Sequence, residues 1–284
     1  MLKQRVITAV VLLAILLPAL FYPAPGPFIA IALAMMGAGA WEWGRLNGLG
    51  HGAALALGAA CVLLCGAAWA AGLPARSLPW VWAAAGALWV LGGAGLLRAG
   101  VAGWPRLPRA LRLAGGVAVL WLAWLAIAQA RVAGINFLLS ILVLVWVADT
   151  FAYFSGRAFG LRLTRNKLAP SISPGKSWEG VWGGMAGVLA LALFWVWLDG
   201  SRGAGVPSLY TLLAGRGWWL LVLGAMFLAA MSVVGDLVES LVKRSAGAKD
   251  SSRLLPGHGG VLDRIDALLP TLPLALMLSS FAQA

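Results

Sequence analysis

The sequence has few of the residues that most often build metal sites and disulfides. Of its 284 residues, only two are histidine, two are cysteine and nine are acidic. Two isolated histidines, His51 and His258, cannot form the His-Glu-x-x-His zinc motif. Cys61 and Cys65 lie within one apolar run, where they provide neither a disulfide framework nor a metal-binding spacing. Charged residues make up 11% of the chain, against about 25% in soluble domains, which excludes an ordinary soluble fold.

Apolar residues are abundant instead. They account for 62% of the chain, and the mean hydropathy is +0.91. Apolar runs near the roughly 20 residues that cross a bilayer predict an all-α, polytopic transmembrane helix bundle with about nine spans. The runs cover residues 6–22, 28–44, 53–73, 79–97, 114–130, 135–156, 181–198, 217–241 and 267–283. The first run lacks a clear signal-peptidase site, so we interpret it as a retained helix.

The basic residues predict the orientation, because Lys and Arg concentrate in cytoplasmic loops. If the N-terminus is cytoplasmic, 17 of the 21 basic residues fall in cytoplasmic segments. The four that fall outside are Arg76, Arg131, Arg202 and Arg216. We therefore expect the N-terminus inside and the C-terminus outside. The formal charge of +12 then reflects topology and contacts with anionic lipid, and we expect no nucleic-acid partner.

The acidic residues are concentrated in three polar stretches. All but Glu42 and Asp199 lie in DTFAYFSGR, which begins at Asp149, in SPGKSWEG at 173–180, or between residues 235 and 266. Asp149 and Asp236 stand at or inside apolar runs, where an ionised carboxylate costs about 2.5–3.5 kcal/mol. A carboxylate held there normally has a partner.

Two pairs of carboxylates have helical spacing. Asp236 and Glu239 are three residues apart, as are Asp263 and Asp266, so each pair shares a face if the segment is helical. Such oxygen ligands suit Mg²⁺, which proteins hold through one or two carboxylates together with substrate phosphates. The spacing alone equally allows salt bridges to neighbouring basic residues. These are Lys243, Arg244 and Arg264.

The segment PGHGG, residues 256–260, separates the two pairs. Its glycines can adopt positive φ and approach a ligand closely, and a glycine-rich turn before a helix presents free N–H groups to phosphate. Lys249, Arg253 and Arg264 add positive charge. The stretch thus combines both halves of a metal–nucleotide site. A P-loop is excluded because Pro170 replaces the first glycine of PSISPGKS.

Residues 240–266, SLVKRSAGAKDSSRLLPGHGGVLDRID, resemble the signature of the phosphatidate cytidylyltransferases, or CDP-diacylglycerol synthases. Every fixed position of that signature is present. These positions are Ser240, Lys243, Arg244, Lys249, Asp250, His258, Gly259, Gly260, Asp263, Arg264 and Asp266. SPGKSWEG and DTFAYFSGR resemble two further segments of the family. Gly175 replaces a residue that is often basic there, which leaves Lys176 as the phosphate contact of that loop.

The resemblance implies an enzyme that joins CTP to phosphatidic acid, giving CDP-diacylglycerol and pyrophosphate, with Mg²⁺ and a second cation such as K⁺. It implies that Asp236, Asp263 and Asp266 are catalytic and that Asp236 and Asp263 bind the metal. It assigns substrate binding to Lys176, Ser177, Lys243, Arg244, Lys249, Asp250, His258, Gly259, Gly260 and Arg264. The residues it gives a supporting role are Asp149, Glu179 and Glu239.

The resemblance also implies a multi-pass protein of the cytoplasmic (inner) membrane, with its active site on the cytoplasmic side. We expect residues 1–134 to form N-terminal transmembrane helices and residues 135–284 the catalytic region; a homodimer is a further expectation. Two other functions stay open. One is another nucleotide-using lipid enzyme such as a polyprenol kinase, and the other is a secondary transporter with acidic residues at membrane depth.

Overall fold

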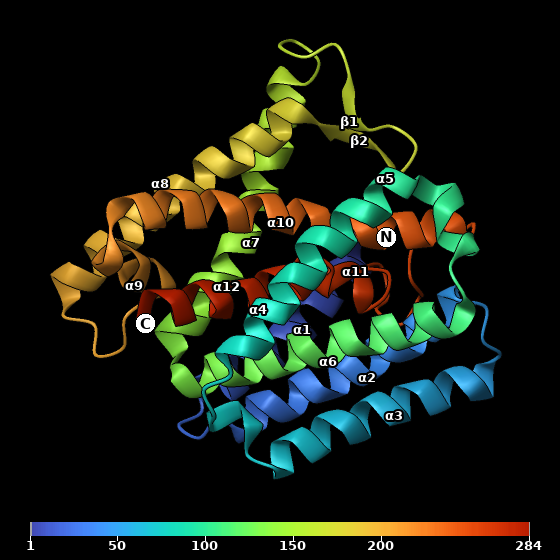
Figure 1. The fold of residues 1–284 in the computed structure, drawn as a ribbon, viewed down its shortest axis with the longest axis horizontal. Helices are drawn as coiled ribbons and strands as arrows, with labels where there is room; N and C mark the ends of the chain where they lie inside the picture. Colours follow the sequence, from blue (N-terminus) through green and yellow to red (C-terminus); the bar gives the residue numbers. More distant parts are fainter. Residues whose placement is uncertain (1, 284) are drawn as a thin grey trace.

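The protein is an all-α helix bundle with one small β-hairpin (Figure 1). The computed structural model describes residues 2–283, with side chains from residue 4 onwards. The first half contains α1 (Leu2–Phe21), α2 (Gly26–Leu46), α3 (His51–Ala70), α4 (Pro79–Ala87), α5 (Gly93–Gly103) and α6 (Arg109–Ala133). The second half contains α7 (Ile135–Phe159), β1 (Lys167–Ala169), β2 (Ser173–Ser177), α8 (Trp178–Arg202), α9 (Leu209–Arg216), α10 (Trp218–Ser245), α11 (Leu262–Ile265) and α12 (Leu268–Gln283).

Within residues 2–283, eight helices are long and apolar enough to cross a membrane. The predicted fold class is therefore confirmed, with eight such spans against the nine predicted runs. The run at 28–44 does form a helix, α2, of 21 residues. It is not among the eight, and its last turns carry Glu42 and Arg45. The run at 79–97 belongs to one longer span, Pro79–Arg106, which includes a π-helical turn at Leu88–Gly92.

The two termini lie at opposite ends of the bundle (Figure 1). The start of α1 contacts the loop before α11, because Arg5 Nε donates to the carbonyl of Gly257 at 3.0 Å and Thr8 Oγ1 to that of Pro256 at 2.9 Å. The N-terminus, the loop at 246–261 and the β-hairpin thus share one end. Which end faces the cytoplasm stays a prediction.

Glycines bring α7 and α8 into close backbone contact. A Cβ atom at Gly180 would lie 3.0 Å from the carbonyl oxygen of Ala152, and one at Gly184 would lie 2.9 Å from that of Ala148. Small residues four apart allow this close approach between membrane helices. The packing places the start of α8, and the β2 strand that leads into it, beside the end of α7 that carries Asp149.

The helices α10 and α12 form the centre of the bundle. Most of their residues are buried, including Leu221, Leu228 and Leu241 on α10 and Leu272 and Leu274 on α12. The first helix, α1, lies at the periphery, and most of its apolar side chains are exposed, as expected where lipid rather than protein covers them. The polar residues of α10 are therefore held on one of the two most enclosed helices among the described residues.

Candidate active site

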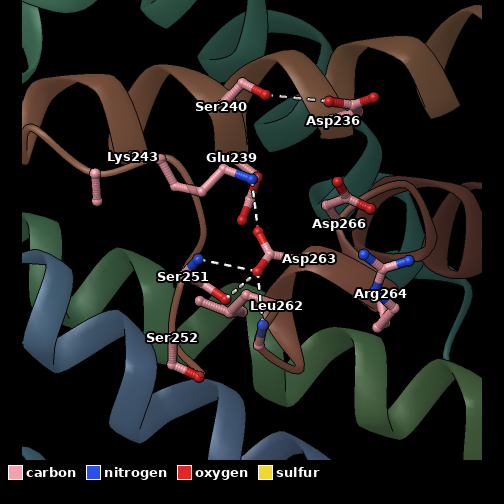
Figure 2. A network of polar contacts seen from close by, with 12 residues as sticks. Asp236, Glu239, Ser240, Lys243, Ser251, Ser252, Leu262, Asp263, Arg264 and Asp266 are labelled. Carbon is pink, nitrogen blue, oxygen red and sulfur yellow. Dashed lines mark hydrogen bonds and ion pairs between the residues drawn. The ribbon is translucent and has the colours of Figure 1, made fainter. Parts of the chain in front are cut away.

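One face of α10 carries the polar residues that the sequence singled out. Asp236, Glu239, Ser240 and Lys243 have the three- and four-residue spacing that aligns side chains along a helix. Ser240 Oγ donates to Asp236 Oδ1 at 3.2 Å, and Lys243 Nζ lies 2.5 Å from Glu239 Oε2. Figure 2 shows these side chains above the segment that contains Asp263 and Asp266.

Lys243 joins α10 to that segment. Its ammonium group lies between two carboxylates, 2.5 Å from Glu239 and 2.6 Å from Asp263 Oδ1. Only 4% of the Glu239 side chain and 6% of the Asp263 side chain are exposed. The structure thus contains the salt bridges that the spacing left open as an alternative, for Glu239 and Asp263 at least.

The carboxylate of Asp263 accepts hydrogen bonds from the loop that precedes α11. Its Oδ2 accepts from the Ser251 N–H at 2.9 Å, from Ser251 Oγ at 2.9 Å and from the Gly260 N–H at 2.7 Å. With Lys243 on Oδ1, and two backbone N–H groups and the Ser251 hydroxyl on Oδ2, both oxygens of the carboxylate are bonded within the protein. The Gly260 N–H, which we expected on the nucleotide, points to Asp263 in this structure.

Gly259 and Gly260 allow the loop to close tightly around its carboxylates. Gly259 has φ of +84°, and a Cβ there would lie 2.6 Å from Asp263 Oδ2. A Cβ at Gly260 would overlap Ser251 Oγ and the carboxylate of Glu42. Close packing therefore favours glycine at both positions, whether or not a ligand binds there.

Glu42 is the residue that the sequence analysis missed. It belongs to α2, is fully buried, and accepts hydrogen bonds from Ser251, Ser252, Val261 and Leu262 of the same loop. The sequence does contain a signal for it. Glu42 falls inside the apolar run 28–44, where an ionised carboxylate is costly and needs a partner, as at Asp149 and Asp236. Only its distance in sequence from the other acids set it aside.

A second polar group lines a cleft between α7, α8 and α10. Lys176 on β2 forms an ion pair with Asp236, with 2.5 Å between Nζ and Oδ2. With Asp149 and Ser177 they border a cavity of about 540 Å³. Ser177 Oγ accepts from the Gly180 N–H at 3.2 Å and so caps α8. The cavity is partly open to its surroundings, because 25% of the Lys176 side chain and 31% of that of Asp236 are exposed.

Asp266 lies next to this group. It ends α11, and its Oδ1 accepts from the N–H of Ala267 at 2.8 Å. The helix α10 packs directly on it, since a Cβ at Gly235 would overlap the Asp266 carbonyl oxygen. Asp236 and Asp266 are therefore neighbours across the α10–α11 interface, and both are drawn in Figure 2.

The other predicted residues lie outside the Lys243 network and outside the lining of the cleft at Lys176. Glu179 Oε1 accepts from the N–H groups of Leu163 and Thr164, at 3.1 and 2.7 Å, and so anchors the segment before the hairpin. Lys249 and Asp250 are exposed on the loop.

Three further predicted residues contact the loop backbone or lie within it. Arg244 Nη1 donates to the Ala248 carbonyl at 3.3 Å, and Arg264 donates to the His258 carbonyl at 2.7 Å. His258 Nδ1 is buried without a hydrogen-bond partner among the described residues.

The donor chemistry of the site suits a hard cation. Within residues 2–283, no three His, Cys, Asp or Glu side chains converge as a ready metal site. Mg²⁺ does not require one, because one or two carboxylates and the phosphates of a substrate complete its coordination. Asp236 and Asp263 as joint ligands stay a prediction, since each already has a lysine partner. Asp266 accepts a single hydrogen bond from the described residues, which leaves its carboxylate the least occupied of the three.

An apolar cavity of about 420 Å³ adjoins the Lys243 network. It lies between α5, α6 and α10, and Glu239 is one of its few polar wall residues. Leu96, Val119 and Val238 are typical of the rest, together with several glycines. An apolar space thus borders the buried carboxylates.

The fold and the site define a class: an integral membrane protein with a carboxylate- and lysine-lined centre at one end of its helix bundle. Comparison with known proteins gives the family. Residues 3–282 match the model of the Cytidylyltransferase family, so the chain belongs to that family. It is 41% identical to the phosphatidate cytidylyltransferase of Pseudomonas aeruginosa over 284 residues, which covers 96% of this chain and 95% of that protein.

Shorter matches involve the same kind of protein. The phosphatidate cytidylyltransferase of Haemophilus influenzae is 49% identical over 140 residues, covering 49% of this chain and 44% of that protein. The phosphatidate cytidylyltransferase of Staphylococcus epidermidis is 37% identical over 159 residues, covering 56% of this chain and 54% of that protein. The predicted family is confirmed.

The packing around Gly260 generates a direct prediction. Gly260→Ala should lower the stability of the purified protein by about 1–3 kcal/mol, because overpacking a filled site has about that cost. Thermal unfolding in detergent would measure it. Gly52→Ala is the matched control, since a Cβ at Gly52 meets nothing within 4 Å. Equal midpoints for the two variants would contradict the packing described here.

Proposed function

We propose that this protein is a phosphatidate cytidylyltransferase, which converts CTP and phosphatidate to CDP-diacylglycerol and pyrophosphate. The observation that carries the proposal is the near full-length match to a relative of that name at 41% identity. The site agrees chemically, because it places carboxylates and lysines where a nucleotide could meet a lipid headgroup. In this reaction the phosphate of the lipid attacks the α-phosphorus of CTP and pyrophosphate leaves.

The reaction must bring two polyanions together. We propose that Lys176 contacts phosphate in the cleft, where its ion pair with Asp236 holds the ammonium group between α8 and α10. The start of α8 adds the N–H groups of a helix N-terminus, which favour bound phosphate. Bound Mg²⁺, held by Asp236 with Asp263 or Asp266, would neutralise phosphate charge and polarise the reacting phosphoryl group. Positioning of the two substrates and stabilisation of charge in the transition state supply the rest of the rate acceleration.

Residues on the exposed loop complete this assignment. We propose that Lys249, Asp250 and Arg264 meet the nucleotide at the mouth of the site, where their side chains are exposed. Since CTP is a cytoplasmic metabolite, this end of the bundle would face the cytoplasm. Residues 135–284 would form the catalytic region and 1–134 the supporting helices, although Glu42 contributes to the loop from the N-terminal part.

The apolar cavity supports an acyl-chain site. Its volume of about 420 Å³ and its apolar walls suit part of an acyl chain, and Glu239 places it beside the Lys243 network. Burying each methylene there contributes about 0.8 kcal/mol. We propose that one acyl chain of phosphatidate occupies this cavity while its headgroup lies at the cleft.

The activity is tested with CTP labelled on the α-phosphate or on the γ-phosphate. Purified protein with phosphatidate and Mg²⁺ should transfer the α-label, and not the γ-label, to a lipid product. EDTA should stop the transfer, and added Mg²⁺ should restore it. Transfer of the γ-label would indicate a kinase, and no lipid product under any condition would favour a transporter. Activity that persists in EDTA would remove the metal from the proposal.

Removing the carboxylate of Asp236 should affect chemistry more than folding. We expect Asp236→Asn to lower kcat by about 10²–10³, the usual cost of losing a charge-stabilising group, with little change in the unfolding temperature because Asp236 is partly exposed. The control is Asp199→Asn, which alters a buried carboxylate on α8 that bonds Asn136, Ser208 and Thr211 instead. A normal kcat in Asp236→Asn would exclude Asp236 from the reaction.

Filling the apolar cavity should lower kcat/KM for long-chain phosphatidate alone. Gly115 lines it, and a Cβ there meets nothing within 4 Å. Gly115→Leu should lower kcat/KM about tenfold for dioleoyl phosphatidate, equivalent to roughly two displaced methylenes, and leave dioctanoyl phosphatidate and CTP unaffected. Gly66→Leu, at an equally open position on α3, is the control. The same loss for both chain lengths would argue against an acyl-chain site.

A further inference from the structure

Glu42 is a buried carboxylate with an unusually complete set of donors. Its side chain is fully buried on α2. Oε1 accepts from Ser252 Oγ at 2.5 Å and from the Val261 N–H at 2.9 Å, and Oε2 accepts from Ser251 Oγ at 3.1 Å and from the Leu262 N–H at 2.8 Å. All four donors belong to one loop that lies 209–220 residues later in the chain.

Two of these bonds hold the start of α11. The residue before this helix, Val261, offers no side-chain cap, and the first N–H groups of a helix have no partner within it. The carboxylate of Glu42 accepts hydrogen bonds from two of those N–H groups. The position of α11, and of Asp263 on its first turn, is therefore set from α2.

Ser251 connects Glu42 to Asp263. Its hydroxyl lies 3.1 Å from Glu42 Oε2 and 2.9 Å from Asp263 Oδ2, so one hydroxyl group lies between two carboxylates. Asp263 continues the chain to Lys243, and Lys243 to Glu239 on α10. A continuous series of polar contacts thus runs from α2 to α10 through the loop.

Glu42 lines neither the cleft at Lys176 nor the apolar cavity. Oε1 accepts from Ser252 and Val261 and Oε2 from Leu262, while the Ser251 hydroxyl has a single proton that Oε2 shares with Asp263 Oδ2. It therefore has no free oxygen for a substrate or a cation, and any effect on the reaction must pass through Ser251, Asp263 and α11.

We propose that Glu42 is a positioning residue for cytidylyl transfer: it fixes the loop 251–262 on α2, and so sets the placement of Asp263 and Asp266 against α10. The proposal rests on the proposed function, because its kinetic readout is that reaction. The division of the chain at residue 134 then separates the catalytic groups from the group that aligns them.

The test is Glu42→Gln, an isosteric change that places an amide NH₂ where donors of the loop approach. We expect kcat to fall at least about tenfold, since small misplacements of reacting groups have effects of this size or larger, while the KM for CTP stays within about twofold. Hydrogen–deuterium exchange should rise in peptides covering 250–262 and not in those from α8. Measurements are made well below the unfolding midpoint of the variant.

Asp199→Asn is the matched control, because it perturbs a buried carboxylate with three donors of its own near the C-terminal end of α8. It should lower the unfolding midpoint without changing kcat or exchange at 250–262. A kcat for Glu42→Gln within twofold of the unaltered protein, or unchanged exchange in the loop, would overturn the proposal.

A second variant decides the matter if Glu42→Gln does not fold. Ser251→Ala removes the hydroxyl between Glu42 and Asp263 and leaves both carboxylates, so it should also lower kcat with little change in the KM for CTP; an unchanged kcat would overturn the proposal. Failure of the unaltered protein to form CDP-diacylglycerol would defeat the proposed function instead. Loop exchange would still report on whether Glu42 fixes the loop.

Discussion

The ammonium group of Lys243 is the contact on which the organisation of the site depends. It lies between Glu239 and Asp263, and all three side chains are nearly removed from solvent. Charges in such surroundings are stable only with close partners, and removing one partner of a buried pair typically costs about 3–5 kcal/mol. The contact joins the segment before α12 to α10, so this polar segment becomes part of the interior of the bundle.

This arrangement separates two kinds of carboxylate. Glu42, Glu239 and Asp263 are buried and bound to the protein's own donors. Asp236 lines the cleft at Lys176, and Asp266, its neighbour across the α10–α11 interface, accepts one hydrogen bond from the described residues. The first group holds the shape of the site, and the second has fewer bonds within the protein. The buried ion pairs and hydrogen bonds join α10 to α11, and so fix where Asp236 and Asp266 stand.

The fold class could be predicted from the sequence because a bilayer permits few solutions: helices of about 20 apolar residues show in composition alone. The hairpin at 167–177 could not, since its short strands have no such pattern. At the site, the spacing of Asp236 and Glu239 predicted a shared helix face. Lys243, four residues from Glu239, was among the partners that the spacing allowed. The partner of Asp236 was not predictable, because Lys176 lies on a distant segment and could reach several acids in an unfolded chain. Glu42 was missed for the same reason, as its donors are more than 200 residues away.

The separation between Glu42 and its donors also has a consequence for synthesis. Chains grow at about 5–20 residues per second, so the 220 residues between Glu42 and Leu262 take on the order of 10–40 s to emerge. During that time α2 stands in or near the membrane with a carboxylate whose partners do not yet exist. Insertion of α2 must therefore tolerate an unsatisfied acid, and the arrival of the last loop completes a helix that was made among the first.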